Sequence, residues 1–115
     1  MNKIDKAKLE AVMLELGHPD NLQGTEYLRM AAALYEPGMS ITKELYPAIA
    51  RAAHTMPSRV ERNMRHSICR AWERGSWEAQ QRYFGSSVDP RRGAPTVGEY
   101  VARIVRVCSE NGIPD

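Results

Sequence analysis

The sequence predicts an all-α fold of five to six helices that contains a helix-turn-helix within residues 41–73. Apolar residues recur at the three- and four-residue spacing of amphipathic helices along most of the chain. No segment alternates apolar and polar residues as a half-buried strand does. A length of 115 residues is enough for one compact domain and too short for two, so we expect residues 1–115 to form a single helical unit.

Two amphipathic helices are predicted before residue 36. The first runs from Ile4 to Leu16, and Gly17 and Pro19 follow it as stop signals. The second runs from Asn21 to Tyr35 and ends at Glu36-Pro37-Gly38, because a proline clashes with the preceding turn of a helix. The apolar stripe of the first helix is made of Ile4, Leu9, Val12, Met13 and Leu16. We also expect Leu14, Leu16, Tyr27, Leu28 and Leu34 in the core.

A pair of helices joined by a three-residue linker comes next. The first helix is capped by Ser40 or Thr42 and extends to Ala53, and Pro47 should kink it or mark the first turn of its second half. The second helix runs from Pro57 to Arg74. This length and order are typical of a helix-turn-helix, in which the second helix enters the major groove of DNA.

Two more helices are predicted in the last third of the chain. Ser76 caps a short helix over Trp77–Phe84, and a loop follows over residues 85–95. Thr96 then caps a final helix that extends to about Glu110. The apolar residues of this final helix that we expect to be buried are Val97, Tyr100, Val101, Ile104, Val105 and Cys108.

The positive charge is concentrated in one quarter of the chain. The net charge is only +2, but residues 51–75 contain six arginines against two glutamates, Glu61 and Glu73. A local basic region on a nearly neutral domain indicates a polyanionic partner at one surface. A solvated helix face with no partner is the alternative interpretation.

Composition argues against a membrane or secreted protein. No apolar run approaches the roughly 18 residues that indicate a membrane span, and the first ten residues have no apolar region of a secretory signal. The two cysteines, Cys69 and Cys108, are too few for a disulfide scaffold of this size. We therefore expect a cytoplasmic protein in a reducing compartment, without a membrane partner.

The segment from Pro57 has the pattern of a recognition helix. At roughly 100° per residue, one side carries an apolar seam made of Val60, Met64, Ile68 and Ala71. The opposite side carries Ser58, Arg62, Cys69 and Glu73. Arg59 and His66 flank one edge of this outer side, and Glu61 and Arg65 flank the other. We therefore expect Arg62 to be exposed and the arginine-rich end to face a partner.

These residue types suit the reading of DNA. An arginine can donate two hydrogen bonds to guanine, and a glutamate can accept one from cytosine. A glutamate among arginines is unfavourable on a surface that only holds phosphate, so Glu61 favours sequence reading. Two alternatives for Glu61 stay open: an ion pair with Arg65 at i,i+4, or a capping box with Ser58.

No motif indicates catalysis, a cofactor or a metal site. The sequence contains no nucleophile–base pair, phosphate-binding glycine loop or carboxylate dyad, so we expect no enzymatic activity and no cofactor. His66 and Cys69 are three residues apart and could share a metal ion. No second pair of ligands stands at a suitable spacing, so no metal site is predicted.

Several segments between Leu14 and Arg106 resemble the C-terminal effector domain of the sporulation initiation response regulators of spore-forming Firmicutes. The segments are LELGHP, GTEYLR, SITKELYPAIA, SRVERNMRH followed by AWERG, the Phe84-Gly85 pair and PTVGEYVA. The resemblance implies a helix-turn-helix that binds a short asymmetric promoter element in double-stranded DNA, often as two copies in tandem.

The resemblance also implies roles for particular residues. Arg59, Glu61 and Arg62 match the base-contacting residues of that family, and Ser58, Arg65 and His66 match residues that contact the DNA backbone or flank the site. The segment Ala71–Phe84 matches a region implicated in contact with the RNA polymerase sigma subunit. The final helix matches one used in homodimer or tandem contacts between neighbouring copies.

Two hypotheses follow from the sequence. The first is a sequence-specific transcription regulator in the bacterial cytoplasm, associated with the nucleoid. Family members carry a phosphorylatable receiver domain that this sequence lacks, so it is expected to be either an excised fragment or a stand-alone orphan. The alternative is a protein-interaction module or antagonist that acts on the sigma subunit or on a homologous regulator.

Overall fold

The computed structural model of the chain describes residues 4–18, 22–85 and 92–109. Within these ranges the fold is all-α, as the sequence predicts. The helices are α1 (Lys6–Glu15), α2 (Gln23–Leu34), the π-helix η1 (Ile41–Leu45), α3 (Tyr46–Ala53), α4 (Pro57–Arg74), α5 (Trp77–Phe84) and α6 (Val97–Cys108). The described residues form no strand, and their only β-type pairing is an isolated antiparallel bridge between Ile4 and Ser109.

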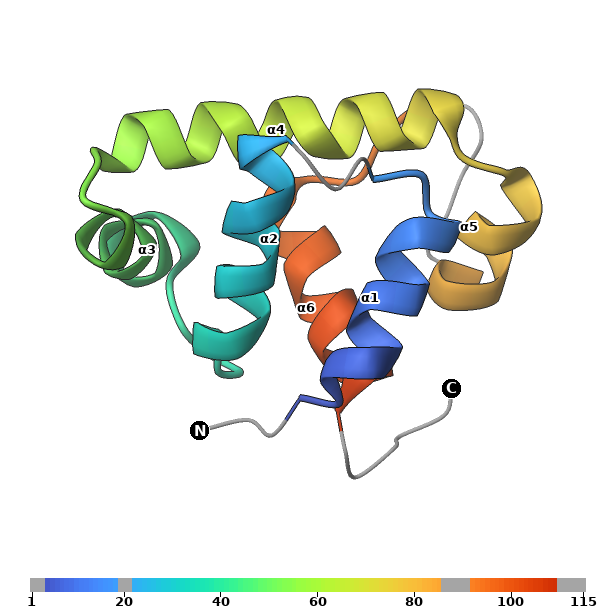
Figure 1. Cartoon of the computed structure of the whole chain (residues 1–115), viewed down its shortest axis with the longest axis horizontal. Coiled ribbons are helices and arrows are strands. Elements are labelled where there is room, and N and C mark those ends of the chain that lie inside the picture. The colour runs from blue at the N-terminus through green and yellow to red at the C-terminus, as the bar shows by residue number, and fades with distance from the viewer. Residues whose placement is uncertain (1–3, 19–21, 86–91, 110–115) are drawn as a thin grey trace.

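The helix α4 runs along one side of the molecule, parallel to its longest dimension (Figure 1). Its 18 residues span about 27 Å. The helices α2, α6 and α1 lie beneath it, α3 lies beside its first turn, and α5 follows at its far end (Figure 1). The outer side of α4 is therefore left uncovered by the other described helices.

Several predicted helix ends differ from the observed ones by one or two residues. The helix α1 begins at Lys6 rather than Ile4, because the Asp5 carboxylate accepts the Lys8 N–H at 3.1 Å and Ile4 pairs with Ser109. The helix α2 ends one residue before Tyr35, whose backbone is extended. The helix α6 ends at Cys108. The predicted boundaries at Asn21 and Glu110 lie outside the described residues.

The segment around Pro47 explains why the third predicted helix has two parts. Ser40, not Thr42, is the cap, and its hydroxyl accepts the Lys43 N–H at 3.1 Å. Residues 41–45 then form a π-turn, and Pro47 stands in the first turn of α3. Proline has no N–H and its ring clashes with the carbonyl four residues earlier, which the wider turn relieves. The second of the two expectations for Pro47 is therefore confirmed.

One hydrophobic core joins the helices, and the expected core residues lie in it with one exception. Leu16, Tyr27 and Leu28 are buried, and Leu34 is partly buried against the core. The prediction for Leu14 was wrong, since it is 73% exposed. The buried face of α1 is already formed by Leu9, Val12 and Met13 together with Leu16. Leu14 points away from that face.

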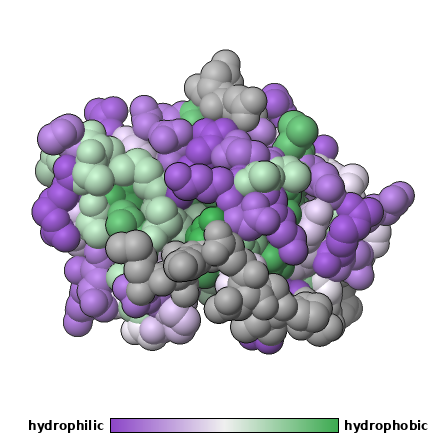
Figure 2. All heavy atoms as spheres, turned by 60° about the horizontal axis from the view of Figure 1, so that its bottom comes forward, coloured by the Kyte–Doolittle hydropathy of each residue, from purple (hydrophilic) through white to green (hydrophobic). Residues whose placement is uncertain are grey.

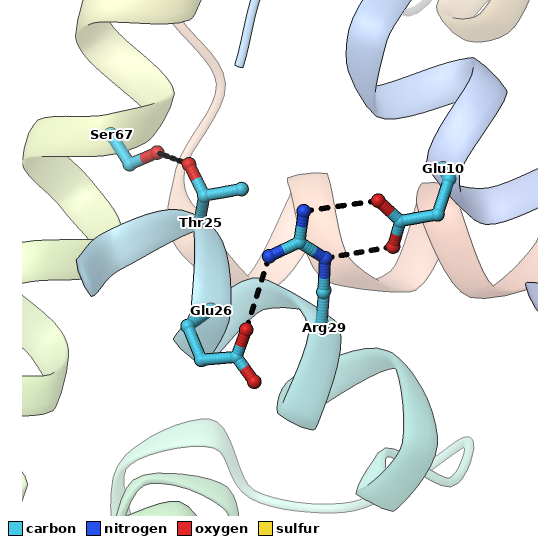
Figure 3. A network of polar contacts seen from close by, with 5 residues as sticks. All are labelled: Glu10, Thr25, Glu26, Arg29 and Ser67. Atoms are coloured by element: carbon cyan, nitrogen blue, oxygen red, sulfur yellow. Dashed lines mark hydrogen bonds and ion pairs between the residues drawn. The ribbon is translucent and has the colours of Figure 1, made fainter. Parts of the chain in front are cut away.

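The helices α2 and α4 cross at very close range. Gly24 on α2 faces the backbone of Asn63 and the side chain of Ser67 on α4. The next residue, Thr25, places its hydroxyl 3.4 Å from the Ser67 hydroxyl (Figure 3). On the other side of α2, Arg29 binds both carboxylate oxygens of Glu10 on α1, at 2.7 and 3.0 Å (Figure 3). These contacts fix α2 between α1 and α4.

A buried histidine continues this network into α6. His18 is 3% exposed, and its Nδ1 lies 3.0 Å from Ser67 Oγ while its Nε2 lies 2.5 Å from Tyr100 Oη. A neutral imidazole satisfies both contacts, with one nitrogen donating and the other accepting. Burial, assisted by the charge of Arg29, lowers the pKa of His18 to about 4. His18 therefore joins α4 and α6 in its neutral form.

Figure 2 shows the molecule turned so that the side opposite α4 comes forward. Hydrophilic side chains cover much of the described surface there, and the hydrophobic areas lie among them rather than as one continuous sheet.

Substituting Gly24 with alanine should destabilise the fold. A Cβ at this position would overlap the Asn63 carbonyl and lie 2.7 Å from Ser67 Cβ, so α2 would have to move away from α4. Overpacking of this kind costs about 1–3 kcal/mol or more. The matched control is Gly98→Ala, which changes the same position of α6 and meets only the Ile41 side chain, 3.2 Å away. Urea unfolding should show a lower midpoint for Gly24→Ala and an unchanged midpoint for Gly98→Ala. Equal midpoints for the two variants would contradict the close crossing of α2 and α4.

Stability should fall as the pH decreases from 6.5 to 4. The pKa of His18 is lowered from 6.5 to about 4 in the folded state, so the unfolded chain binds the proton first and is favoured in that window. The full shift corresponds to about 3 kcal/mol. His18→Gln should remove this share of the pH dependence of the free energy of unfolding. His54→Asn, at an exposed histidine, should keep it; a slope unchanged by His18→Gln would refute the assignment.

Candidate nucleic-acid interface

The turn between α3 and α4 is built by three residues, as the sequence predicts. His54 ends α3 in a left-handed conformation with φ 57°, and the Thr55 N–H donates to the Ala50 carbonyl at 2.9 Å. Met56 then extends the backbone as the N-cap of α4, and Pro57 occupies the first helical turn. Pro57 suits this place because its missing N–H has no helical partner there. The two helices and their turn have the order of a helix-turn-helix.

A buried seam sets which side of α4 faces outward. Val60, Met64, Ile68 and Ala71 are all 0–1% exposed, which confirms the apolar seam predicted for this helix. Ser67 belongs to the same buried side. The far end of α4 is fixed as well, since a Cβ on Gly75 would lie 2.6 Å from the Leu16 carbonyl oxygen of the α1 end. The rotation of α4 about its axis is therefore determined by packing along its full length.

The candidate DNA-contacting residues lie on the uncovered side of α4. Ser58, Arg59, Arg62, Arg65 and His66 are exposed, and Glu61 is partly buried. The exposure of Arg62 confirms the expectation drawn from the helical pattern. Within the described part of the chain, neither Arg59 nor Arg62 makes an ion pair. Both guanidinium groups are available to an external partner.

Glu61 is held by an ion pair rather than by a capping box. Its Oε2 lies 3.1 Å from Arg65 Nη1, and the side chains are 34% and 60% exposed. The capping box with Ser58 does not form, because it would require Ser58 to be the N-cap of α4. The N-cap is Met56, and the helix begins at Pro57. Ser58 therefore lies inside the first turn, with no role as a cap.

The Glu61–Arg65 pair lies beside α3. Burial and the negative charge of Glu61 raise the pKa of Tyr46 to about 12, while the charge of Arg65 opposes the increase. Tyr46 is the first residue of α3, so both charges act across the boundary between the two helices. This position leaves Arg59 and Arg62 as the free arginines at the start of α4.

The segment Ala71–Phe84 combines buried and exposed residues. Ala71 and Phe84 are buried, and Trp72 packs edge-on against Phe84 with ring centroids 5.2 Å apart. Trp77, at the start of α5, is 47% exposed. In α6, all six apolar residues that the sequence predicts as buried are buried. The apolar face of α6 is thus used inside the domain, and only its outer face is open to a partner.

Two polar residues that support the site were not predicted. Ser67 was not singled out, although a serine within an apolar seam indicates a buried polar partner. His18 stands in the segment LELGHP, which carries the family resemblance, but its structural role was not predicted. Its partners lie on α4 and α6, far away in the sequence. Neither residue touches the outer side of α4, so their role is to hold the helix in place.

No feature of the described residues points to a metal centre or a membrane span. No group of three histidine, cysteine, aspartate or glutamate side chains among them is arranged to hold a metal ion. No helix in the described ranges is long and apolar enough to cross a bilayer. Cys69 is exposed and Cys108 is buried, and both are free thiols.

The comparison with known protein families decides the class. Residues 9–107 match the family described as "Sporulation initiation factor Spo0A C terminal". The chain belongs to this family. The match begins at Leu9 in α1, ends at Val107 in α6, and covers every described helix between them. The Spo0A C-terminal family is one of regulatory DNA-binding effector domains in sporulation initiation, which agrees with the helix-turn-helix and the arginine-rich face of α4.

Proposed function

We propose that this protein binds double-stranded promoter DNA with sequence preference and regulates transcription, with α4 as the recognition helix in the major groove. One observation supports this most directly: the N-terminal half of α4 has a fully buried apolar side and an uncovered arginine-rich side. A major groove of about 12 Å admits one α-helix. Recognition helices usually read bases with their N-terminal residues.

The residues of α4 divide into two roles in this proposal. Arg59, Glu61 and Arg62 read base edges, and Ser58, Arg65 and His66 contact the backbone or flank the site. The free guanidinium groups of Arg59 and Arg62 support the first role, since an arginine can donate two hydrogen bonds to one guanine. The ion pair of Arg65 with Glu61 supports a positioning role for Arg65. Exposed arginines near phosphates also increase affinity for every duplex.

Two protein contacts belong to the same proposal. The sigma subunit of RNA polymerase would meet the segment Ala71–Phe84, where the exposed Trp77 indole is the largest apolar group. A second copy of the chain would meet the outer face of α6, because the inner face is buried in the domain core. Both surfaces lie away from the N-terminal half of α4, so DNA and protein contacts would not compete.

Duplex binding should weaken as salt increases, with a slope of about −0.9 in log affinity against log salt for each phosphate neutralised. Arg65→Ala should weaken binding to all sequences about equally and reduce the slope by about one phosphate. Arg59→Ala or Arg62→Ala should lose roughly 1–3 kcal/mol of discrimination at single base positions. Arg74→Ala is the matched control, since Arg74 is also exposed but lies about 18 Å beyond Arg62 along α4.

Fluorescence anisotropy on a duplex obtained by binding-site selection would measure these effects. The control Arg74→Ala should leave base preference unchanged. A flat salt dependence, or no duplex binding at low salt, would contradict DNA binding and favour the interaction module instead.

Glu61→Ala separates base reading from simple pairing. Removal of a negative charge beside phosphates should tighten non-specific binding whichever role Glu61 has. If Glu61 accepts a hydrogen bond from a cytosine, the substitution should also remove preference at one base pair, and this is the result that we expect. The measurement compares the selected site with its single-base variants. An unchanged preference profile would limit Glu61 to its ion pair with Arg65.

A further inference from the structure

Met56 is an apolar residue at an unusual place on the surface. It is 67% exposed, and only two other large hydrophobic residues in the described part of the chain, Leu14 and Trp77, are classed as exposed. Met56 is the N-cap of α4 and stands directly before the row of Ser58, Arg59 and Arg62. The fold therefore leaves a flexible thioether side chain in solvent at the end of α4 that is proposed to enter the groove.

Helix capping does not explain a methionine here. The N-caps of α1, η1, α5 and α6 are Asp5, Ser40, Ser76 and Thr96, and each accepts a backbone N–H with its side chain. The N-cap of α4 makes no such bond. A serine, threonine, aspartate or asparagine would stabilise the start of this helix. The sequence forgoes that stabilisation at Met56.

Core packing does not explain Met56 either. Two other described helices also lack a side-chain cap, but their apolar N-caps are at least partly buried: Leu22 partly, and Leu45 completely. Met56 lies four residues before Val60, so a helical backbone at this point would place it over the buried seam. Instead its backbone is extended, with φ −105° and ψ 146°, and the side chain leaves the seam.

The surroundings of Met56 suggest what it contacts. The exposed candidate residues that follow it most closely, Ser58, Arg59 and Arg62, are hydrogen-bond donors that suit guanine and phosphate, and none of them suits an apolar group. The thymine C5-methyl is the apolar group that a base pair presents in the major groove. An unbranched, polarisable methionine adapts to such a group without a fixed geometry.

We propose that Met56 is a specificity-determining residue that contacts the C5-methyl group of one thymine, at the end of the DNA site read by the first turn of α4. The inference rests on the proposed function, because it requires α4 to lie in the major groove. It adds an apolar contact to the hydrogen-bonding residues, and it concerns a position that none of the polar roles above uses. The contact contributes selectivity for thymine over bases that lack the methyl group.

The test replaces each thymine of the selected duplex, one at a time, with deoxyuridine, which removes the methyl group alone. Loss of one methyl contact corresponds to about a fourfold weaker binding. The unsubstituted chain should show this weaker binding when one particular thymine is replaced. Met56→Ala should bind the thymine and uracil duplexes equally at that position, and Met56→Leu should restore the preference. Leu14→Ala, at a similarly exposed leucine on α1, is the matched control and should behave as the unsubstituted chain.

The possible results separate the two proposals. If Met56→Ala weakens binding by the same factor on both duplexes, Met56 acts only on the start of α4 and the inference is overturned. A thymine preference that persists in Met56→Ala at every position also overturns it. Absence of any duplex binding by the unsubstituted chain would instead reject the proposed function itself.

Discussion

The fold depends on the close crossing of α2 and α4 at Gly24. Because Gly24 has no side chain, the α2 backbone reaches the Asn63 carbonyl and the Ser67 side chain of α4. This approach brings the Thr25 hydroxyl to Ser67, and Ser67 in turn contacts His18, which contacts Tyr100 on α6. A single crossing thus aligns three helices through a buried polar network. The rotation of α4, and with it the identity of the exposed arginines, follows from that alignment.

The outer side of α4 combines two kinds of arginine, and the difference comes from local partners. Arg65 is paired with Glu61 beside α3, so its charge is partly neutralised within the protein. Arg59 and Arg62 have no ion-pair partner among the described residues. Exposed ion pairs are weak, so the Glu61–Arg65 pair can open when DNA offers other partners. The free arginines do not have to break a contact before they bind.

Sequence patterns were sufficient for the elements that depend on local spacing. The apolar seam of α4, the caps at Ser76 and Thr96 and the buried face of α6 all follow from periodicity and capping chemistry, and each was found. The DNA-contacting roles of the α4 side chains stay predictions, since helical spacing gives exposure but not a partner. The match to the Spo0A C-terminal family adds the regulatory class, which periodicity alone could not supply.

The features that were missed depend on contacts between distant residues. Leu14 was expected in the core because it is apolar, but four other residues already fill the buried face of α1. Spacing alone left two alternatives for Glu61, and the structure favours the ion pair with Arg65 because Met56, not Ser58, is the N-cap of α4. The His18–Tyr100 contact joins residues more than eighty positions apart, and no local pattern encodes it. Tertiary packing decides such features.

The pairing of Ile4 with Ser109 brings the first and last described residues of the domain together. The Asp5 N–H donates to the Cys108 carbonyl at 2.9 Å, so the first and last described segments run side by side. In Figure 1 they meet on the side of the molecule that lies away from α4. Neighbouring ends of this kind tolerate circular permutation. A permuted domain in which residues 4 and 109 are joined by a short linker should therefore keep the same helix packing, although the helices follow one another in a different order along the chain.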